Sequence, residues 1–243
     1  MSDNPQLTSM AAAQIDAWPY RGYRFTPGVI AHAVWLYFRF HLSFRDVQDL
    51  LAERGIIVSH EAIRQWCVKF GVTFAAGLRR RRARPGDKWH LDEVLLKICG
   101  KRHWLCRAVV LDIPVQSRRD QQAAERFLRQ VVDGVGYEPR VVVTDKLASC
   151  PPAIRRVLPK REHRRHKRLN HRAENSHLPT RKRERVLQCF KSAEHAQRFL
   201  GPFSAVNNHF RPRRHLFTAY AYRQIRTERR SVWQDVTLGA LRQ

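Results

Sequence analysis

The sequence predicts a mixed α/β sheet with flanking helices, preceded by an all-α domain. Two observations support this fold class. Between Pro27 and Phe70, apolar residues recur every three or four positions, which is the period of amphipathic helices. From Lys88 onwards, short apolar runs with β-branched residues alternate with helical patterns, which is typical of strands and helices in one α/β domain.

The N-terminal part is expected to contain a loose leader and then helices. Residues 1–24 are rich in Ala, Ser, Gln and Pro and are predicted to be flexible. An amphipathic helix begins at Pro27, and Ser43 is expected to cap a second helix that runs to about Glu53. The apolar residues expected on the inner face of this second helix are Val47, Leu50 and Leu51.

A third helix is expected from His60 to about Phe70, capped by Ser59 and stopped by Gly71. Three helices with a short turn before the last form a helix-turn-helix, whose third helix lies in the major groove of DNA. The outward residues of this helix, which are candidates to contact bases or phosphates, are His60, Glu61, Arg64, Gln65 and Lys69. The alternative is a three-helix bundle that only packs or dimerises.

The segment from Leu78 to Gly86 carries five arginines followed by Pro-Gly, which indicates a linker that also binds phosphate. Its expected DNA contacts are Arg79, Arg80, Arg81 and Arg82. A solvated run of charge is the alternative. The whole chain is also basic, because 46 Lys and Arg face 21 Asp and Glu and give a net charge of +25. Nucleic acid is the expected partner for such an excess, since a membrane surface would favour charge gathered on one amphipathic helix.

The cysteines and the hydropathy exclude several classes of protein. None of the five cysteines forms a Cys-x-x-Cys pair, which argues against a zinc ribbon and against a disulfide framework. The N-terminus lacks the pattern of a signal peptide, and no apolar run approaches the length that spans a membrane. The sequence therefore predicts a cytoplasmic protein with free thiols.

The α/β part begins with a predicted buried strand, Lys88 to Ile98, that carries an acid, Asp92, within it. A turn at Gly100–Lys101 leads to a second strand, His103 to Val109, and then to a third, Val110 to Gln116.

A helix follows, with Ser117 as its cap. It is expected to run from Arg118 to about Val132 and to be broken by Gly134 and Gly136. The next strand, Val141 to Asp145, is expected to lie beside the first strand of the sheet.

The remaining elements are less regular. A short helix is expected at Ile154–Leu158, Glu174 is expected to begin or precede a helix broken or kinked at Pro179, and Ala193 to about Phe210 forms the last convincing helix. The chain from Arg211 is not assigned. This order of elements is that of the ribonuclease H-like fold, although several other α/β folds share it.

Three acids in separate elements, Asp92, Asp145 and Glu174, could hold two divalent cations through oxygen ligands. Such ions would activate a water or a 3′-hydroxyl at a phosphodiester. Each acid also has an ordinary alternative. Asp92 could pair with an arginine at a strand end, Asp145 could be a turn residue or an N-cap, and Glu174 alone is uninformative.

A group of histidines lacks the spacing of a zinc site and is expected to contact phosphate or solvent instead. They are His163, His166, His171 and His177.

Several motifs, taken together, resemble bacterial insertion-sequence transposases, most closely those of insertion-sequence family six. They are Trp89-His-Leu-Asp-Glu93, Val115-Gln-Ser-Arg-Arg-Asp120, Val143-Thr-Asp-Lys-Leu147, Asn170-His-Arg-Ala-Glu-Asn-Ser-His177, Arg181-Lys-Arg-Glu-Arg185 and Gln188-Cys-Phe-Lys-Ser192. Ser43-Phe-Arg-Asp-Val47 and Val58-Ser-His-Glu-Ala-Ile63 extend the likeness into the helical part, so that it covers about residues 22–225 in one order.

The resemblance implies a ribonuclease H-like catalytic domain of the Asp-Asp-Glu class, with Asp92, Asp145 and Glu174 as the catalytic, metal-binding acids. It implies Mg²⁺, with Mn²⁺ as a substitute, recognition of terminal inverted repeats by the N-terminal domain, joining of 3′ ends to target DNA, and a homo-oligomer, at least a dimer, on paired ends. Basic residues near the acids are expected to contact phosphates: Arg118, Arg119, Lys146 and Arg172.

The chain departs from the family's pattern in two places. The hairpin after Arg107 is expected to be shorter than in the family, and Cys150 is followed by Pro151 and Pro152, which would delay the next helix. Two alternatives therefore stay open: a catalytically decayed copy that acts only as a sequence-specific DNA-binding protein, and a nuclease without sequence preference.

The expected domains are a leader at residues 1–24, a helix-turn-helix domain at 25–76, a basic linker at 77–87, a ribonuclease H-like catalytic domain at 88–225 and a C-terminal tail at 226–243.

Overall fold

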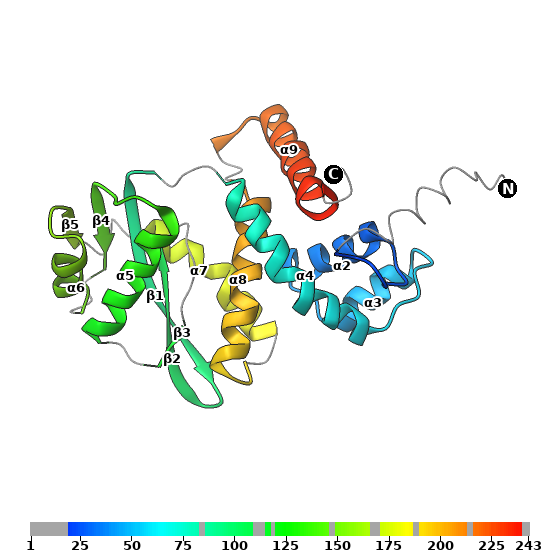
Figure 1. Cartoon of the computed structure of the whole chain (residues 1–243), viewed down its shortest axis with the longest axis horizontal. Coiled ribbons are helices and arrows are strands. Elements are labelled where there is room, and N and C mark those ends of the chain that lie inside the picture. The colour runs from blue at the N-terminus through cyan, green and yellow to red at the C-terminus, as the bar shows by residue number, and fades with distance from the viewer. Residues whose placement is uncertain are drawn as a thin grey trace. The chain divides into compact units, whose positions relative to one another are not determined.

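The computed structural model describes residues 19–82, 86–108, 115–117, 120–145, 149–165, 171–186, 190–212 and 216–239. The chain forms two compact units (Figure 1). A helical unit comprises residues 1–82 and 202–243, and a sheet unit comprises residues 83–201. The division differs from the expected boundaries, because the residues from 202 onwards are grouped with the N-terminal helices.

The helical unit contains the three expected helices. They are α2 (Pro27–Arg39), α3 (Phe44–Ala52) and α4 (His60–Arg80). Their predicted starts are confirmed, because the Ser43 and Ser59 side chains each accept a hydrogen bond from a backbone N–H of the first turn. Val47 and Leu51 are buried as expected, whereas the inward placement of Leu50 is wrong, since its side chain is 37% exposed.

Helix α4 does not stop at Gly71, and this part of the prediction is wrong. A glycine inside a helix costs about 1 kcal/mol relative to alanine, but here it allows a close approach. A Cβ at position 71 would lie 2.8 Å from Cε2 of Phe38 on α2. The longer helix carries Arg79 and Arg80 in its last turn, so the expected linker begins as helix.

The C-terminal segment completes the helical unit with a helix that was not predicted, α9 (Ala219–Leu238). The second half of α8 (Ala193–Phe210), which was predicted in full, also belongs to this unit. The expected leader is wrong for its last residues, because Tyr20 is fully buried against Phe70. Residues 1–18 of that leader lie outside the described residues.

The sheet unit is a five-stranded mixed sheet in the order β3-β2-β1-β4-β5. Its strands are β1 (Lys88–Ile98), β2 (Lys101–Ala108), β3 (Val115–Gln116), β4 (Val141–Thr144) and β5 (Glu162–Arg165). β1, β2 and β3 pair antiparallel, and β4 and β5 continue the sheet in parallel with β1. The prediction of β1 and of β4 beside it is confirmed, whereas β5 was missed because its residues are polar and mostly exposed.

The first hairpin turns at Cys99 and Gly100, whose φ angles of 49° and 75° suit a tight two-residue turn. The predicted turn at Gly100–Lys101 is therefore displaced by one residue, since Ile98 pairs with Lys101. The second hairpin, where residues seemed to be missing, lies in 109–114 and outside the described residues. Its two strands still pair antiparallel, with Leu105 opposite Val115.

Two helices pack on one face of the sheet (Figure 1): α5 (Gln121–Val135) and α6 (Cys150–Val157). The predicted cap of α5 and its break at Gly134 are wrong, whereas its predicted break at Gly136 is confirmed. Asp120 and not Ser117 is the N-cap, with its side chain accepting from the N–H of Ala123 at 2.8 Å, and the helix continues through Gly134 to a left-handed Gly136.

The two prolines of α6 do not delay the helix, so that expectation is wrong. Pro151 and Pro152 lie in its first turn, where their missing N–H groups would have no partner within the helix. Helix α7 (His171–Val186) is likewise not broken, because it continues through Pro179.

The shared core of this face holds apolar residues of β1, β4, α5 and α6. Its largest buried members are Trp89, Leu91, Phe127, Leu128, Ile154 and Leu158.

Candidate active site

Two of the predicted acids occupy matching positions on neighbouring parallel strands. The β1–β4 register pairs Lys88 with Val141 and His90 with Val143. Each of the three β1 residues that pair with β4 thus lies opposite the residue 53 positions later, and Asp145 is likewise 53 positions after Asp92. Asp92 lies two residues beyond His90 in β1, and Asp145 directly follows β4. Extended by two residues beyond the His90–Val143 pair, this register sets the two acids opposite each other.

The residue before Asp145 is fixed from the edge strand β5. Thr144 is fully buried, and its hydroxyl donates to the carbonyl oxygen of Asp145 at 3.0 Å. The same hydroxyl forms a 2.8 Å hydrogen bond with Nε2 of His163 on β5. Burial, followed by the charges of Arg165 and Arg155, lowers the pKa of His163, which favours the neutral ring.

This contact shows a role for His163 that the sequence did not reveal. The spacing of the histidines argued against zinc and towards phosphate or solvent, whereas the ring is half-buried and holds the end of β4. No local signal in the sequence identifies this role, because β5 is polar and is recognised only by its pairing with β4.

The third predicted acid, Glu174, lies on α7, which contacts β1. The end of α7 is attached to the sheet by Glu184, whose Oε1 accepts from the N–H of Lys97 at 3.3 Å. Arg183, also on α7, is fully buried with its guanidinium 5.3 Å from the ring centroid of Phe199 on α8. The placement of Glu174 on a helix against the sheet is as the sequence predicted.

The side chains of Asp92 and Glu174 are outside the described set, so the distances among the three carboxylates are not part of this geometry. Within the described set, no three His, Cys, Asp or Glu side chains converge as a metal site would require.

The outward residues predicted on α4 are all exposed, but they have partners within the protein. Glu61 accepts two hydrogen bonds from Arg64, at 2.8 and 2.7 Å, and a weaker one from Gln65. These bonds from Arg64 lower the pKa of Glu61 to about 2. The backbone N–H of His60 donates to the Gln48 side chain of α3, which joins the two helices at the start of α4.

The structure describes only some of the other predicted DNA contacts. The Lys69 ammonium lies 4.7 Å from the ring centroid of Tyr23, and the arginines at 79–82 are exposed at the end of α4. Arg118, Arg119 and Lys146 lie outside the described residues, as does the side chain of Arg172 on α7.

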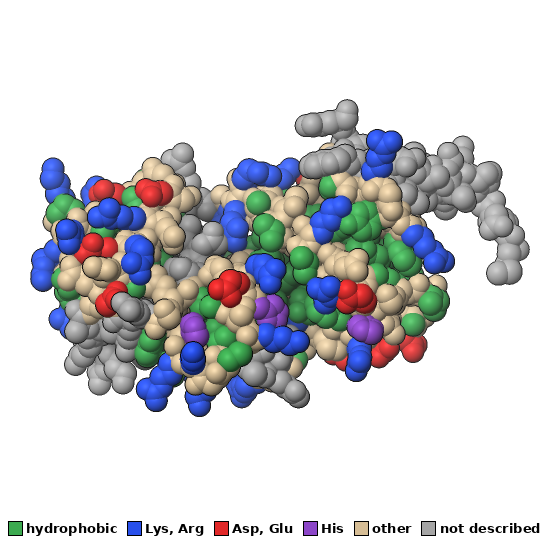
Figure 2. Space-filling view, turned by 60° about the horizontal axis from the view of Figure 1, so that its bottom comes forward, with side chains coloured by type: hydrophobic (Ala, Val, Ile, Leu, Met, Phe, Trp, Pro, Cys, Tyr) green, Lys and Arg blue, Asp and Glu red, His purple; other side chains and the backbone are tan. Residues whose placement is uncertain are grey.

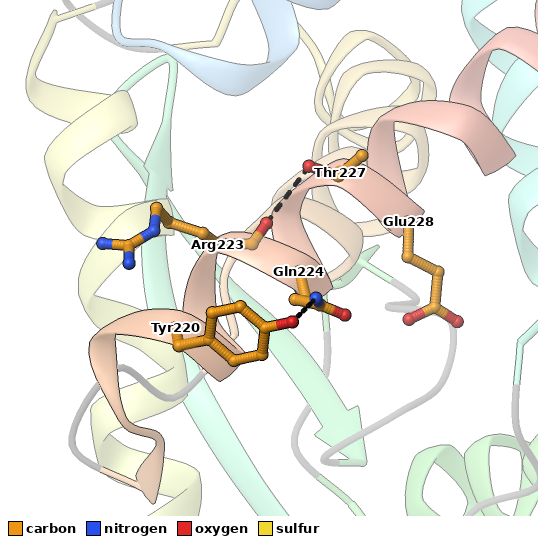
Figure 3. Close-up of a pocket in the computed structure, with 5 residues that line it drawn as sticks. All are labelled: Tyr220, Arg223, Gln224, Thr227 and Glu228. Atoms are coloured by element: carbon orange, nitrogen blue, oxygen red, sulfur yellow. Dashed lines mark hydrogen bonds between the residues drawn. The ribbon is translucent and has the colours of Figure 1, made fainter.

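A shallow hollow of about 540 Å³ lies on α9 (Figure 3). Its described lining is Tyr220, Arg223, Gln224, Thr227 and Glu228. Gln224 Nε2 donates to the Tyr220 hydroxyl at 2.6 Å, and Thr227 donates to the carbonyl oxygen of Arg223. All five of these lining residues belong to α9, and Glu228 is the one acid among them. Lysine and arginine side chains are spread widely over the visible face of the molecule (Figure 2).

Comparisons with known proteins agree with the sequence resemblance. The profile of a family described as a DDE domain matches residues 86–213. The chain is 31% identical over 144 residues to the transposase for insertion sequence-like element IS431mec of Staphylococcus aureus (strain N315), which covers 57% of this chain and 64% of that protein. The same values hold for the transposase for insertion sequence element IS257 in transposon Tn4003 of Staphylococcus aureus.

The chain thus spans 64% of the length of these staphylococcal relatives. Among solved structures, an intasome of simian T-cell lymphotropic virus in complex with a PP2A regulatory subunit is similar, with a TM-score of 0.37 and 14% identity. The match covers 71% of this chain and 67% of the chain in that structure. Similarity at that level supports no argument. None of the described helices is long and apolar enough to cross a membrane.

Proposed function

The chain belongs to the DDE-domain family of insertion-sequence transposases, and from that premise we propose that it nicks DNA at the terminal inverted repeats of a mobile element and joins the 3′ ends to target DNA. The observation that carries the proposal is the matching position of Asp92 and Asp145 across β1 and β4. The strand order, three antiparallel strands continued by two parallel ones, supports a ribonuclease H-like arrangement.

The proposed catalytic residues are Asp92, Asp145 and Glu174. Side chains alternate along a strand, so position 92 is expected to share the face of His90, opposite to the core formed by Trp89 and Leu91. Three carboxylates on that face suit a hard divalent cation such as Mg²⁺, with Mn²⁺ as a substitute. When bound, such ions activate a water or a 3′-hydroxyl and stabilise the leaving oxygen of a phosphodiester.

The protein's other side chains are proposed to position the catalytic acids and to neutralise phosphate charge. His163 and Thr144 fix the backbone at Asp145. The basic residues near the acids are proposed to neutralise phosphate charge as the scissile bond enters the site. They are Arg118, Arg119, Lys146 and Arg172.

Recognition of the element's ends is assigned to α4, with α2 and α3 as its support. Its N-terminal turn is exposed and held by Gln48 of α3, which suits an element that inserts into a groove. The connection between α3 and α4, residues 53–59, is longer than the three- or four-residue turn of a common helix-turn-helix. Paired ends require at least two copies of the chain, so the active species is proposed to be a homo-oligomer.

The test is a nicking assay with the purified full chain, labelled duplex carrying the element's end, and Mg²⁺. We expect a nick at the 3′ end that disappears with EDTA and with Asp92→Asn, Asp145→Asn or Glu174→Gln. The matched control is Asp133→Asn, which changes an exposed acid on α5 and is expected to keep full activity.

Three results would contradict the proposal in different ways. End-specific binding without nicking under any divalent metal would indicate the decayed, DNA-binding form. Nicking without preference for the end sequence would indicate a general nuclease. Nicking that survives all three substitutions would show that other residues hold the metal.

A further inference from the structure

Three arginines meet in the helical unit where α2, α8 and α9 converge. Arg39 is in the last turn of α2, Arg211 directly follows α8, and Arg226 lies on α9. Arg39 is at least 172 residues away from each of the other two along the chain, so only the fold brings them together.

Hydrogen bonds fix this convergence. Asn207 is buried near the end of α8, and its Nδ2 donates to the carbonyl oxygen of Phe38 at 2.7 Å, next to Arg39. Arg229 of α9 donates to the carbonyl oxygens of Asn208 and His209, which satisfies backbone groups at the end of α8.

Aromatic side chains complete the junction. The Trp35 ring of α2 lies 5.8 Å from Phe210 of α8, and the Arg230 guanidinium of α9 lies 4.6 Å from the Trp35 ring centroid. Phe210 in turn meets Trp233 of α9 at 5.8 Å between ring centroids. The backbone positions of the three arginines are therefore held by a packed junction and not by a loop.

Among the residues that the structure describes, Arg39, Arg211 and Arg226 form no ion pair with an acid. Arg211 and Arg226 are exposed, and Arg39 is half-buried. Burial, together with the charges of Arg211 and Arg226, lowers the pKa of Arg39, which records that like charges are close together.

We infer that Arg39, Arg211 and Arg226 form a binding site for the phosphate backbone of duplex DNA. Like charges held together by a packed core repel each other in the free protein, and a polyanion removes that repulsion. The choice of DNA as the polyanion rests on the proposed function. The three arginines belong to α2, to the residue after α8 and to α9, and none of them lies on α4.

The test measures binding of the full chain to a short random-sequence duplex in EDTA over a range of salt concentrations. Each phosphate contact contributes about 0.9 to the slope of log affinity against log salt, so the triple variant Arg39→Gln/Arg211→Gln/Arg226→Gln should lose about 2–3 from that slope. Its affinity should fall at least about tenfold at 0.1 M salt. The matched control is Arg223→Gln, an exposed arginine of α9 outside the cluster, which should leave the slope nearly unchanged.

Two further measurements keep the outcome interpretable. Without DNA, the melting temperature of the triple variant should equal or exceed that of the parent, because a repulsion has been removed. Equal slopes for parent and triple variant, or an equal loss in Arg223→Gln, would overturn the inference. Nicking of end DNA by the parent protein is measured separately. If the parent nicks and the triple variant keeps its salt slope, only the arginine site is rejected. If the triple variant loses slope but the parent does not nick, only the proposed chemistry is rejected.

Discussion

The hydroxyl of Tyr20 donates a 2.6 Å hydrogen bond to the backbone carbonyl oxygen of Thr237, 217 residues later in the chain. Tyr20 is fully buried, and burial raises its pKa, so the hydroxyl stays protonated and can donate. Thr237 lies in the last turn of α9, where backbone carbonyls have no partner within the helix. One buried hydrogen bond thus joins the start of the helical unit to its last helix.

Replacing Tyr20 with Phe should destabilise the helical unit by about 1–2 kcal/mol, because the buried carbonyl of Thr237 loses its partner. The free energy of unfolding, measured by denaturant titration, is the readout. Tyr220→Phe is the control, since Tyr220 is 66% exposed and its loss should change stability by less than about 0.5 kcal/mol. Equal effects of the two substitutions would contradict a structural role for the Tyr20 hydroxyl.

A second stability prediction concerns the contact between α4 and α9. A Cβ at Gly77 would lie 2.6 Å from Cγ1 of Val236, so Gly77→Ala should destabilise by about 1–3 kcal/mol through overpacking. Gly134→Ala is the matched control, because Gly134 is exposed in α5 with open space around it and should gain about 0.4–1 kcal/mol. Adding Val236→Ala to Gly77→Ala should restore part of the loss, and a double variant less stable than the single would argue against the clash.

Glu61 pairs with Arg64 on the exposed face of α4 that we propose contacts DNA. Its carboxylate holds the Arg64 guanidinium in two hydrogen bonds and adds a negative charge to a proposed DNA-binding face. Glu61→Gln should therefore tighten binding to random-sequence duplex, by about threefold to tenfold at low salt. Glu53→Gln, an exposed acid at the end of α3, is the control. A loss of binding specific to one end sequence would instead show that Glu61 contacts a base.

The sequence could predict the elements whose pattern is local. The long strand with Asp92, the strand before Asp145 and the helix Ala193–Phe210 were all recognisable from apolar periodicity. The ends of helices were less predictable, because tertiary contacts decide them. Gly71 would end an isolated helix, and it continues here because its missing side chain admits Phe38.

Elements that depend on distant partners could not be predicted. Helix α9 is rich in polar residues, and its few buried side chains, such as Trp233 and Thr237, pack against N-terminal residues far away in the chain. Strand β5 is charged along its length, so only its pairing with β4 identifies it. For the candidate site, spacing alone could suggest Asp92 and Asp145, whereas the support from His163 required the sheet topology.

The pH dependence of stability provides the last prediction. Burial is the first cause that lowers the pKa of four histidines below the usual 6.5: His32, His163, His195 and His209. As the pH falls through about 6.5, the unfolded chain binds protons that the folded chain does not, so the free energy of unfolding must fall with it. The denaturant midpoint, measured between about pH 8 and about pH 5, reports this change. The measurement uses a Glu184→Gln background, because burial raises the pKa of Glu184 and its protonation in the folded protein would oppose the histidine effect. His163→Gln should flatten the dependence, and a midpoint that stays constant or rises on acidification would mean that these histidines are protonated in the folded protein.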